Sequence, residues 1–300
     1  MIILLFLALS LSTPLSVELL NYTSDFAIGF HLKCDDLLPQ TSASHASLAA
    51  LICGANLPTS TLQNDLLRSS LIHAYVVSGS HLLLLDQFFS IFKIPGLVRF
   101  LFLSFYSLIA GWQAPVVRAL LSWIFTATKF RMRLSIPSDL LVAIAGMTCL
   151  LLFPAWWSSL SLILSWCASL ALSAVGLFRI RKTFPRIFAT QLCIFVFMSF
   201  PLWGWGNLHP LSVLFNLTLM PFISLILFPT AILGFLFPPA LFLFEHSESL
   251  FRWILEHGTE PIQLVRSSSL PPGYSWMWIT AWHVVIHFFR IHTRQGRDHS

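Results

Sequence analysis

Long apolar runs decide the fold of this chain, and the clearest of them is residues 211–235, LSVLFNLTLMPFISLILFPTAILGF. This run contains no Asp, Glu, Lys or Arg. It exceeds the roughly 20 residues that a helix needs to cross the hydrocarbon core of a bilayer. Because lipid offers no hydrogen-bond partners to the backbone, such a run must be helical there. Residues 211–235 therefore predict a membrane-spanning helix.

The composition of the whole chain agrees with this interpretation. Of 300 residues, 56% are hydrophobic and only 10% are charged, and the mean hydropathy is +0.79. A soluble protein normally has about a quarter of its residues charged, so a soluble fold is excluded. The sequence predicts an all-α polytopic integral membrane protein with about eight to ten transmembrane helices, some broken or kinked, plus an outer interfacial amphipathic helix. The predicted spans are residues 2–20, 72–92, 97–112, 115–128, 140–153, 157–178, 188–205, 211–235, 240–254 and 274–290.

The chain divides into three predicted parts. Residues 1–20 form an N-terminal membrane anchor. A cleaved signal peptide is disfavoured, because no basic residue precedes this run and its small-x-small match, Ala8 to Ser10, comes early. Residues 21–70 form a short outer segment on the periplasmic side. Residues 71–300 form the transmembrane domain and end in a basic tail.

The charges in the loops orient the chain. Basic residues cluster in alternate loops, whereas the loops between them, at 113, 154–155 and 207–210, carry no charge. By the positive-inside rule the basic loops face the cytoplasm, and residues 21–70 lie outside. A cytoplasmic C-terminus requires residues 240–254 to span as well, although that run contains two glutamates. The basic residues are Lys93, Arg99, Lys129, Arg131, Arg133, Arg179, Arg181, Lys182 and Arg186, with Arg290, Arg294 and Arg297 in the tail.

The outer segment carries two further signals. Residues 64–72 combine apolar side chains with Asp65 and Arg68, a pattern typical of a short amphipathic helix at the membrane interface. Cys34 and Cys53 lie in the same segment, where an oxidising compartment would let them form a structural disulfide. The other three cysteines lie in apolar runs and are interpreted as core residues.

Motifs for metals, cofactors and nucleotides are missing from the sequence. It contains no C-x-x-C, no H-E-x-x-H and no G-x-x-x-x-G-K-[ST]. We therefore expect no metal, no cofactor and no ATP-driven motor of that type in this chain.

Polar residues inside a predicted span usually face a cavity or a partner. The first such place is Ser78-Gly79-Ser80, bracketed by His73 and His81. Gly weakens a helix and serines can satisfy freed backbone groups, so a broken half-helix at membrane depth is plausible. The alternative is a close helix contact through small residues.

Two other places carry polar residues at membrane depth. Arg118 lies near the start of its span, and Asp86 is its candidate partner, although an arginine at a helix end can also snorkel outward. Asn216 is followed by Pro221 and Pro229, which should kink the helix and free carbonyl groups. The alternative for Asn216 is an ordinary kinked packing helix.

These segments resemble, in order and spacing, the signature of the ComEC competence family of DNA-uptake channels. The likeness covers about residues 48 to 235. The matching segments are GANLP (54–58) through Leu67 and Arg68, His73 with SGSH (78–81), Gly111 with APVVRA (114–119), Pro154 with LSW (164–166) and Ala168, and HPLS (209–212) with Asn216 and Pro221.

The sequence also departs from the family pattern. Ser80 replaces the usual Leu, Ser70 stands where Gly is common, and Leu162 and Ile163 replace Phe-Gln. The outer segment is too short for the OB-type domain of many relatives. No His-x-His-x-Asp-His motif is present, so nuclease activity is not carried over.

The resemblance implies an inner-membrane channel for single-stranded DNA in natural transformation, lacking its own motor and nuclease domain. Its partners would be single-stranded DNA, membrane lipid, an outer DNA receptor and a cytosolic ATP-driven translocase. Assembly into a homo-oligomer is left open. The expected conduit-lining residues are His73, Ser78, Gly79, Ser80, His81, Arg118 and Asn216.

Two other functions compete with the channel. The first is an intramembrane serine hydrolase or acyltransferase, with Ser78 or Ser80 as nucleophile and His81 or His73 as base. Serine and histidine one to three residues apart on one helix seldom align in this way, so we expect that the chain is not an enzyme. The second is a membrane assembly scaffold without a conduit.

Overall fold

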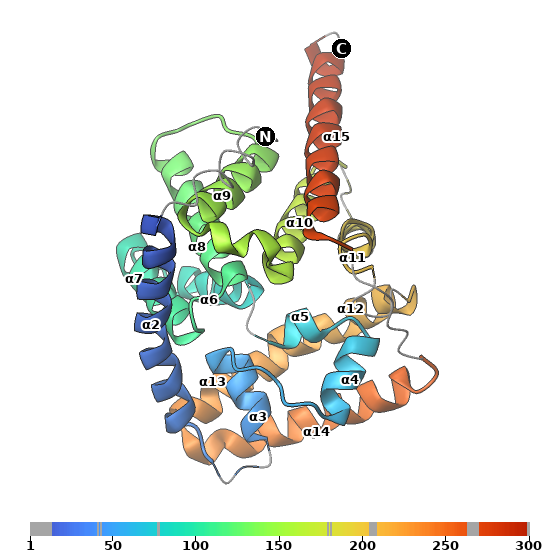
Figure 1. Ribbon diagram of the computed structural model, residues 1–300. Helices are drawn as coiled ribbons and strands as arrows, with labels where there is room; N and C mark the ends of the chain where they lie inside the picture. The colour runs from blue at the N-terminus through green and yellow to red at the C-terminus, as the bar shows by residue number, and fades with distance from the viewer. Residues whose placement is uncertain are drawn as a thin grey trace. The chain divides into compact units, whose positions relative to one another are not determined.

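The computed structural model describes residues 14–40, 42, 44–76, 79–178, 180, 182–203, 209–262 and 270–298. In these residues the regular secondary structure is helical throughout, as Figure 1 shows, and no strand occurs among them. The prediction of an all-α fold is confirmed. Residues 1–13, which carry most of the predicted N-terminal anchor, lie outside the described part of the chain.

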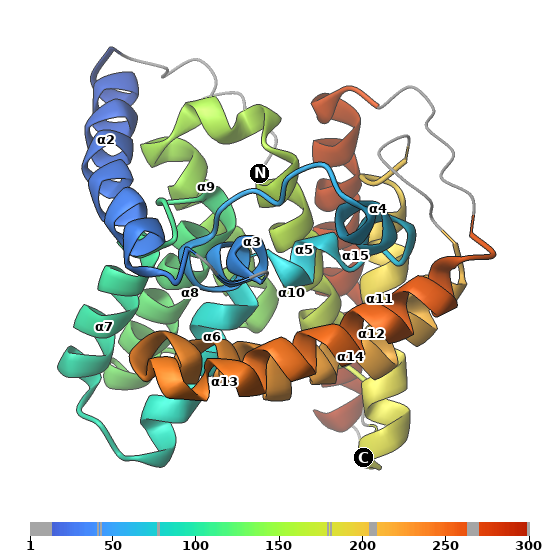
Figure 2. The same cartoon turned by 90° about the horizontal axis from the view of Figure 1, so that it is seen from below.

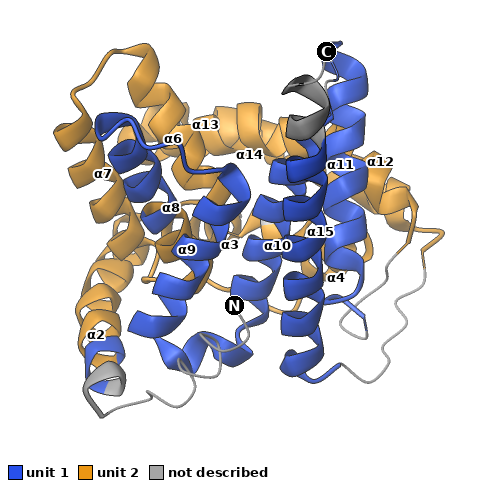
Figure 3. Cartoon of the chain, turned by 90° about the horizontal axis from the view of Figure 1, so that it is seen from above, with its two compact units in different colours: residues 1–20, 121–203, 268–300 blue, residues 21–120, 204–267 orange. Residues whose placement is uncertain are grey.

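The chain folds as two compact units, coloured separately in Figure 3. Unit 1 comprises residues 1–20, 121–203 and 268–300, and unit 2 comprises residues 21–120 and 204–267. The predicted boundary at residue 20 falls inside helix α2 (Pro14–Leu37), which continues without interruption into the outer segment. The division between the units also falls inside α8 (Ala114–Arg131).

Unit 2 contains one hydrophobic core that joins the outer segment to the later helices. The outer segment contributes α3 (His45–Leu48), the π-helix η1 (Ala49–Cys53) and α4 (Thr61–Arg68), followed by α5 (Ile72–Tyr75). The later helices contribute the π-helix η3 (Ile223–Leu227), α13 (Phe228–Leu236) and α14 (Leu241–Thr259), of which α13 and α14 run side by side in Figure 2. Residues 21–70 therefore do not fold as a separate part.

Helix α4 differs from the predicted interfacial helix in position and in surroundings. It begins at Thr61, where the hydroxyl of Ser60 caps the backbone N–H of Gln63, and it ends at Arg68. Its apolar residues Leu62 and Leu66 are 5% and 0% exposed, and α4 packs against α14. The apolar face that the sequence assigned to the membrane interface is thus covered by protein.

The continuous helix over Leu211–Leu236 is long and apolar enough to cross a membrane, and it is the single helix of the described residues that is. It has 26 residues and a mean hydropathy of 2.2. It consists of α12 (Leu211–Phe222), η3 and α13, and the π-turn lies between Pro221 and Pro229. Proline lacks the N–H of the regular helical hydrogen bond, which accounts for the irregular turn at this place. The predicted span and its distortion are both present.

Four further apolar helices have between 14 and 17 residues: α7 (Gly96–Ile109), α9 (Ser138–Leu152), α10 (Leu160–Val175) and α11 (Thr183–Ser199). At 1.5 Å per residue they reach roughly 21 to 26 Å. This is less than the roughly 30 Å of a bilayer core. The number of membrane crossings therefore stays a prediction.

Unit 1 is built around α10, which packs against α9, α11 and α15 (Pro272–Asp298). The ring of Trp166 lies directly over Gly146 of α9, where a Cβ atom would collide with it. Trp166 Nε1 donates a hydrogen bond to His283 Nε2 of α15 at 2.9 Å. Asp139 of α9, 3% exposed, forms an ion pair with Arg290 of α15 at 2.5 Å. These two polar contacts join α15 to its neighbours.

Candidate functional site

The second predicted span is broken in the structure. Helix α5 ends at Tyr75, and Val76 takes an extended backbone conformation with φ −77° and ψ 147°. The next helix, α6 (Gly79–Ile91), begins at Gly79. Ser78, one of the predicted conduit residues, lies outside the described residues. The helix from 72 to 92 is thus not continuous, which agrees with the expected distortion.

Gly79 brings two of the sequence motifs together. A Cβ atom at this position would lie 2.9 Å from the Cβ of Ala119 and 3.0 Å from the carbonyl oxygen of Pro115. Such distances leave room for glycine only, unless the backbone moves. The N-terminus of α6 is therefore in close contact with the first turns of α8, the helix that carries Arg118.

Arg118 lies on a buried stretch of α8. Its side chain is 5% exposed, and its neighbours from Ala114 to Leu120 are buried as well. The sequence proposed Asp86 as its partner. In the structure Asp86 forms an ion pair with Arg99 of α7, whose Nε donates to its carboxylate at 2.9 Å. The predicted pairing is replaced because α7 packs directly against α6, the helix of Asp86.

His81 contacts the third motif region. Its side chain is 1% exposed, and its ring packs on the ring of Phe228 with centroids 4.5 Å apart. Phe228 directly follows the π-turn η3. The sequence predicted a polar cavity beside His81, and in the structure the ring of Phe228 covers one side of this residue. The reason is that the irregular turn of the 211–236 helix packs into the same core.

The remaining predicted residues of the described chain lie on α5, α6 and α12. His73 is half-buried on α5, before the break, and Ser80 is half-buried on α6. Asn216 of α12 donates a hydrogen bond from Nδ2 to the carbonyl oxygen of Ser212 at 2.8 Å, within its own helix. Gly79, Arg118 and His81 therefore form the centre of the candidate site.

The outer segment is fastened to the turn that precedes α8. A disulfide joins Cys34 to Cys53, with their Cα atoms 5.9 Å apart, which is the pair that the sequence favours. His31 Nδ1 donates to the carbonyl oxygen of Cys53 at 2.8 Å. Gln113 Nε2 donates to the carbonyl oxygen of Gly54, also at 2.8 Å. The disulfide-closed segment thus contacts the same α7–α8 turn from which the Arg118 helix starts.

Sequence reasoning missed a buried polar cluster on α14. Glu248, treated only as a doubt about residues 240–254, is 1% exposed. Its Oε1 accepts hydrogen bonds from Ser47, Tyr75 and Arg252. Arg252 lies four residues after Glu248, and this spacing was the signal available in the sequence. The partners Ser47 and Tyr75 are too distant in sequence to be found in that way.

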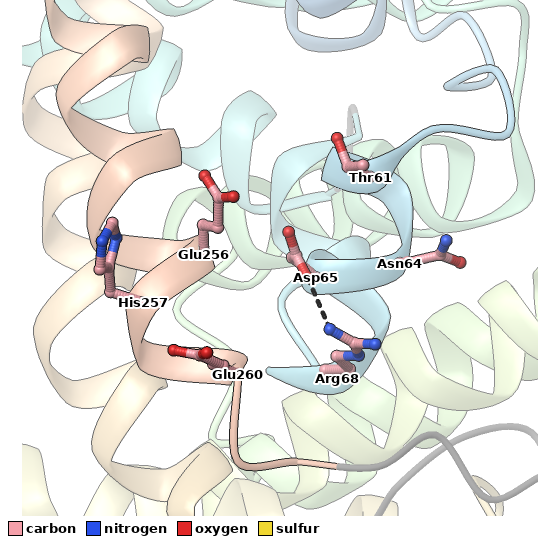
Figure 4. Close-up of a pocket in the computed structure, with 7 residues that line it drawn as sticks. All are labelled: Thr61, Asn64, Asp65, Arg68, Glu256, His257 and Glu260. Atoms are coloured by element: carbon pink, nitrogen blue, oxygen red, sulfur yellow. Dashed lines mark hydrogen bonds and ion pairs between the residues drawn. The ribbon is translucent and has the colours of Figure 1, made fainter.

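A polar pocket of about 390 Å³ lies between α4 and α14. Figure 4 shows Glu256 of α14 and Glu260, which directly follows this helix, on one side and Asp65 and Arg68 of α4 on the other. Arg68 forms an ion pair with Asp65 at 3.2 Å. Three carboxylates thus face one guanidinium, with His257 at the edge. This balance disfavours a polyanion such as DNA in this pocket.

The family model described as competence protein matches residues 51–295. The chain belongs to the Competence family. The match includes every segment on which the resemblance to ComEC rests, and the resemblance is confirmed. Membership gives the chain a role in DNA uptake during competence and fits the membrane association of this family. No curated protein and no solved structure matches the chain.

Proposed function

We propose that this chain is a multi-pass inner-membrane conduit for single-stranded DNA in natural transformation, with its C-terminus in the cytoplasm. The observation that carries the proposal is the contact at Gly79, where the broken second span meets the helix of Arg118. His81 lies two residues further along α6. Two of the family segments, SGSH (78–81) and APVVRA (114–119), thus meet inside unit 2.

The chemistry of the substrate supports this location. A polyanion that crosses lipid needs a path without an acidic ring, lined by groups that replace water around the phosphates. Arg118 provides a fixed positive charge, and the interrupted helix around Ser80 provides hydroxyl and backbone groups. The acidic pocket between α4 and α14 involves other residues of unit 2.

The energy for transport would come from another protein, because the sequence contains no Walker-type nucleotide motif. We propose a cytosolic ATP-driven translocase as the motor and an outer DNA receptor as the source of the strand. In this scheme the chain itself has no enzymatic role.

The hydrolase alternative has little support in the geometry of α6. Ser80 and His81 are consecutive residues of this helix, and consecutive side chains diverge by about 100°. A nucleophile and its base need a direct hydrogen bond, which this spacing does not provide.

The proposal is tested by deleting the chain and supplying labelled duplex DNA to competent cells. We expect normal nuclease-sensitive DNA at the cell surface and loss of nuclease-resistant DNA inside, and the intact chain should restore the internalised DNA. Normal internalisation in the deletion strain would refute the conduit. A scaffold differs from a conduit in that substitution of Arg118 alone would leave uptake intact.

A further inference from the structure

Helix α14 turns one of its acidic side chains, that of Glu248, inward. Glu248 is 1% exposed and shares its face of the helix with the buried Phe244 and Phe251, whereas Trp253 is 60% exposed. A carboxylate in such an apolar interior is strongly unfavourable unless it is paired and hydrogen-bonded. The structure supplies those partners in full.

The carboxylate of Glu248 collects three donors. Arg252 Nε donates to Oε1 at 2.8 Å, and Ser47 Oγ of α3 donates to the same oxygen. The phenol of Tyr75 donates to it at 3.4 Å. Arg252 Nη2 also donates to Ser47 Oγ at 3.1 Å, which closes the cluster. Glu248 therefore joins α14 to the outer segment and to the end of α5.

Tyr75 is the last residue of α5 and is held at both ends of its side chain. Its hydroxyl contacts Glu248, and its ring stacks on Phe251 with centroids 5.5 Å apart and an interplanar angle of 22°. The residue is 0% exposed. Since Val76 already leaves the helical conformation, the position of Tyr75 determines where the helix breaks.

The far side of the break is equally constrained. Gly79 begins α6 in contact with Pro115 and Ala119, with no room for a Cβ atom. The two helix ends on either side of the break, Tyr75 and Gly79, are thus held by different helices, α14 and α8. A shift of either end changes the direction in which α6 starts.

We infer that Glu248 is a positioning residue for the break between α5 and α6, acting through Tyr75. The role of this break in DNA passage rests on the proposed function, whereas the positioning itself does not. The hydrogen-bond partners of Glu248 among the described residues are Ser47, Tyr75 and Arg252, so Glu248 acts by fixing the helix end that precedes the break.

The test combines Glu248→Ala, Tyr75→Phe and the double variant with a reporter cysteine, Ser80→Cys, labelled by a charged thiol reagent. The labelling rate reports the surroundings of the start of α6. We expect each single variant to change this rate by at least about fivefold, the effect of one ordinary hydrogen bond. The double variant should change it no more than the larger single effect, because the two residues act through one contact.

Two comparison variants separate positioning from general loss of stability. Glu248→Gln keeps an acceptor oxygen for Ser47 and Tyr75 and should restore the labelling rate to within about twofold of the parent. Glu245 lies on the same helix and accepts a hydrogen bond from Ser42 Oγ at 2.8 Å. The variant Glu245→Gln should leave the labelling rate unchanged. DNA uptake per folded molecule is measured in parallel with Ser80 intact and should follow the same order.

The inference would be overturned if Glu248→Ala lowered only the amount of folded protein and left the labelling rate and the uptake per molecule unchanged. Independent, additive effects of the two single variants would overturn it as well. If the variants alter the labelling rate but even the parent chain supports no DNA uptake, the positioning role is supported and the proposed conduit is refuted.

Discussion

A buried guanidinium is unfavourable by several kcal/mol unless other groups stabilise its charge. Arg118 is only 5% exposed, so an arginine that snorkels to a helix end is a poor description of it. It directly precedes Ala119, whose Cβ faces Gly79 at the start of α6. Under the proposed function, this charge beside the helix break would face the path of the phosphates.

Arg118→Leu is expected to lower internalised DNA at least about tenfold, because it removes a fixed positive charge from the proposed path. The amount of protein in the membrane should stay within about twofold of the parent, since Leu is tolerated there. Arg131→Leu, an exposed position on the same helix, is the matched control and should have little effect. Uptake is measured as nuclease-resistant label, and normal uptake in Arg118→Leu would remove this residue from the conduit.

Gly79→Ala is expected to reduce uptake because its methyl group would meet Ala119 at 2.9 Å. Overpacking of this kind typically costs about 1 to 3 kcal/mol. Ala119→Gly removes the opposing methyl group, so the double variant should recover part of the lost uptake and of the lost thermal stability. Gly79→Leu should abolish uptake with or without Ala119→Gly. A double variant no better than Gly79→Ala would show that the contact with Ala119 does not limit this position.

At the level of the elements, α9 and α10 meet at a contact that permits no side chain. The ring of Trp166 occupies the space over Gly146, and its indole N–H donates to His283 of α15. Trp166 belongs to the LSW segment of the family signature. One glycine thus supports a hydrogen bond between two other helices.

Gly146→Ala is therefore expected to destabilise the protein by about 1 to 3 kcal/mol, since Trp166 must move away from α9. Gly29→Ala on α2 is the control, because a Cβ there meets nothing within 4 Å. It should be neutral or stabilising by up to about 1 kcal/mol. Thermal unfolding in detergent measures both variants. Equal stability of Gly146→Ala and the parent would mean that Trp166 does not need this space.

The elements differ in how well the sequence predicts them. The 211–236 helix was predictable because an uninterrupted apolar run and two prolines determine both its length and its irregular turn. The sequence also predicted a helix at 240–254, where α14 lies, but not the partners of Glu248, because a glutamate in an apolar run has the same sequence whether it faces lipid or a buried partner. The partners of Glu248, Ser47 and Tyr75, are 201 and 173 residues away in sequence. The Asp86 and Arg118 pairing failed for a related reason, since Arg99 on the neighbouring helix reaches Asp86 instead.

On the scale of the whole molecule, composition predicted the helical class, whereas the division into units depends on long-range packing. The polar composition of residues 21–70 predicted a separate outer segment. In the structure, however, Leu48 and Leu66 of this segment pack in one core with Phe244 and Phe251. Local patterns cannot reveal such a core, because its two halves come from opposite ends of the chain. The contacts of the candidate site were not predictable from local patterns, as the packing of the His81 ring on the distant Phe228 illustrates.

The orientation of the molecule in the membrane is the last prediction, and it follows from the loop charges. Asp36→Cys lies at an exposed position of the segment assigned to the outer side, and Ser135→Cys lies at an exposed position of a basic loop assigned to the cytoplasm. A membrane-impermeant thiol reagent should label Asp36→Cys in intact spheroplasts and Ser135→Cys only after permeabilisation. Both variants are made in a Cys193→Ser parent, because Cys193 is free and half-buried, whereas Cys149 and Cys167 are buried and Cys34 and Cys53 are joined by a disulfide. The reverse pattern would place the basic loops outside. Labelling of both positions in intact spheroplasts would mean that the segment between them crosses the membrane an even number of times.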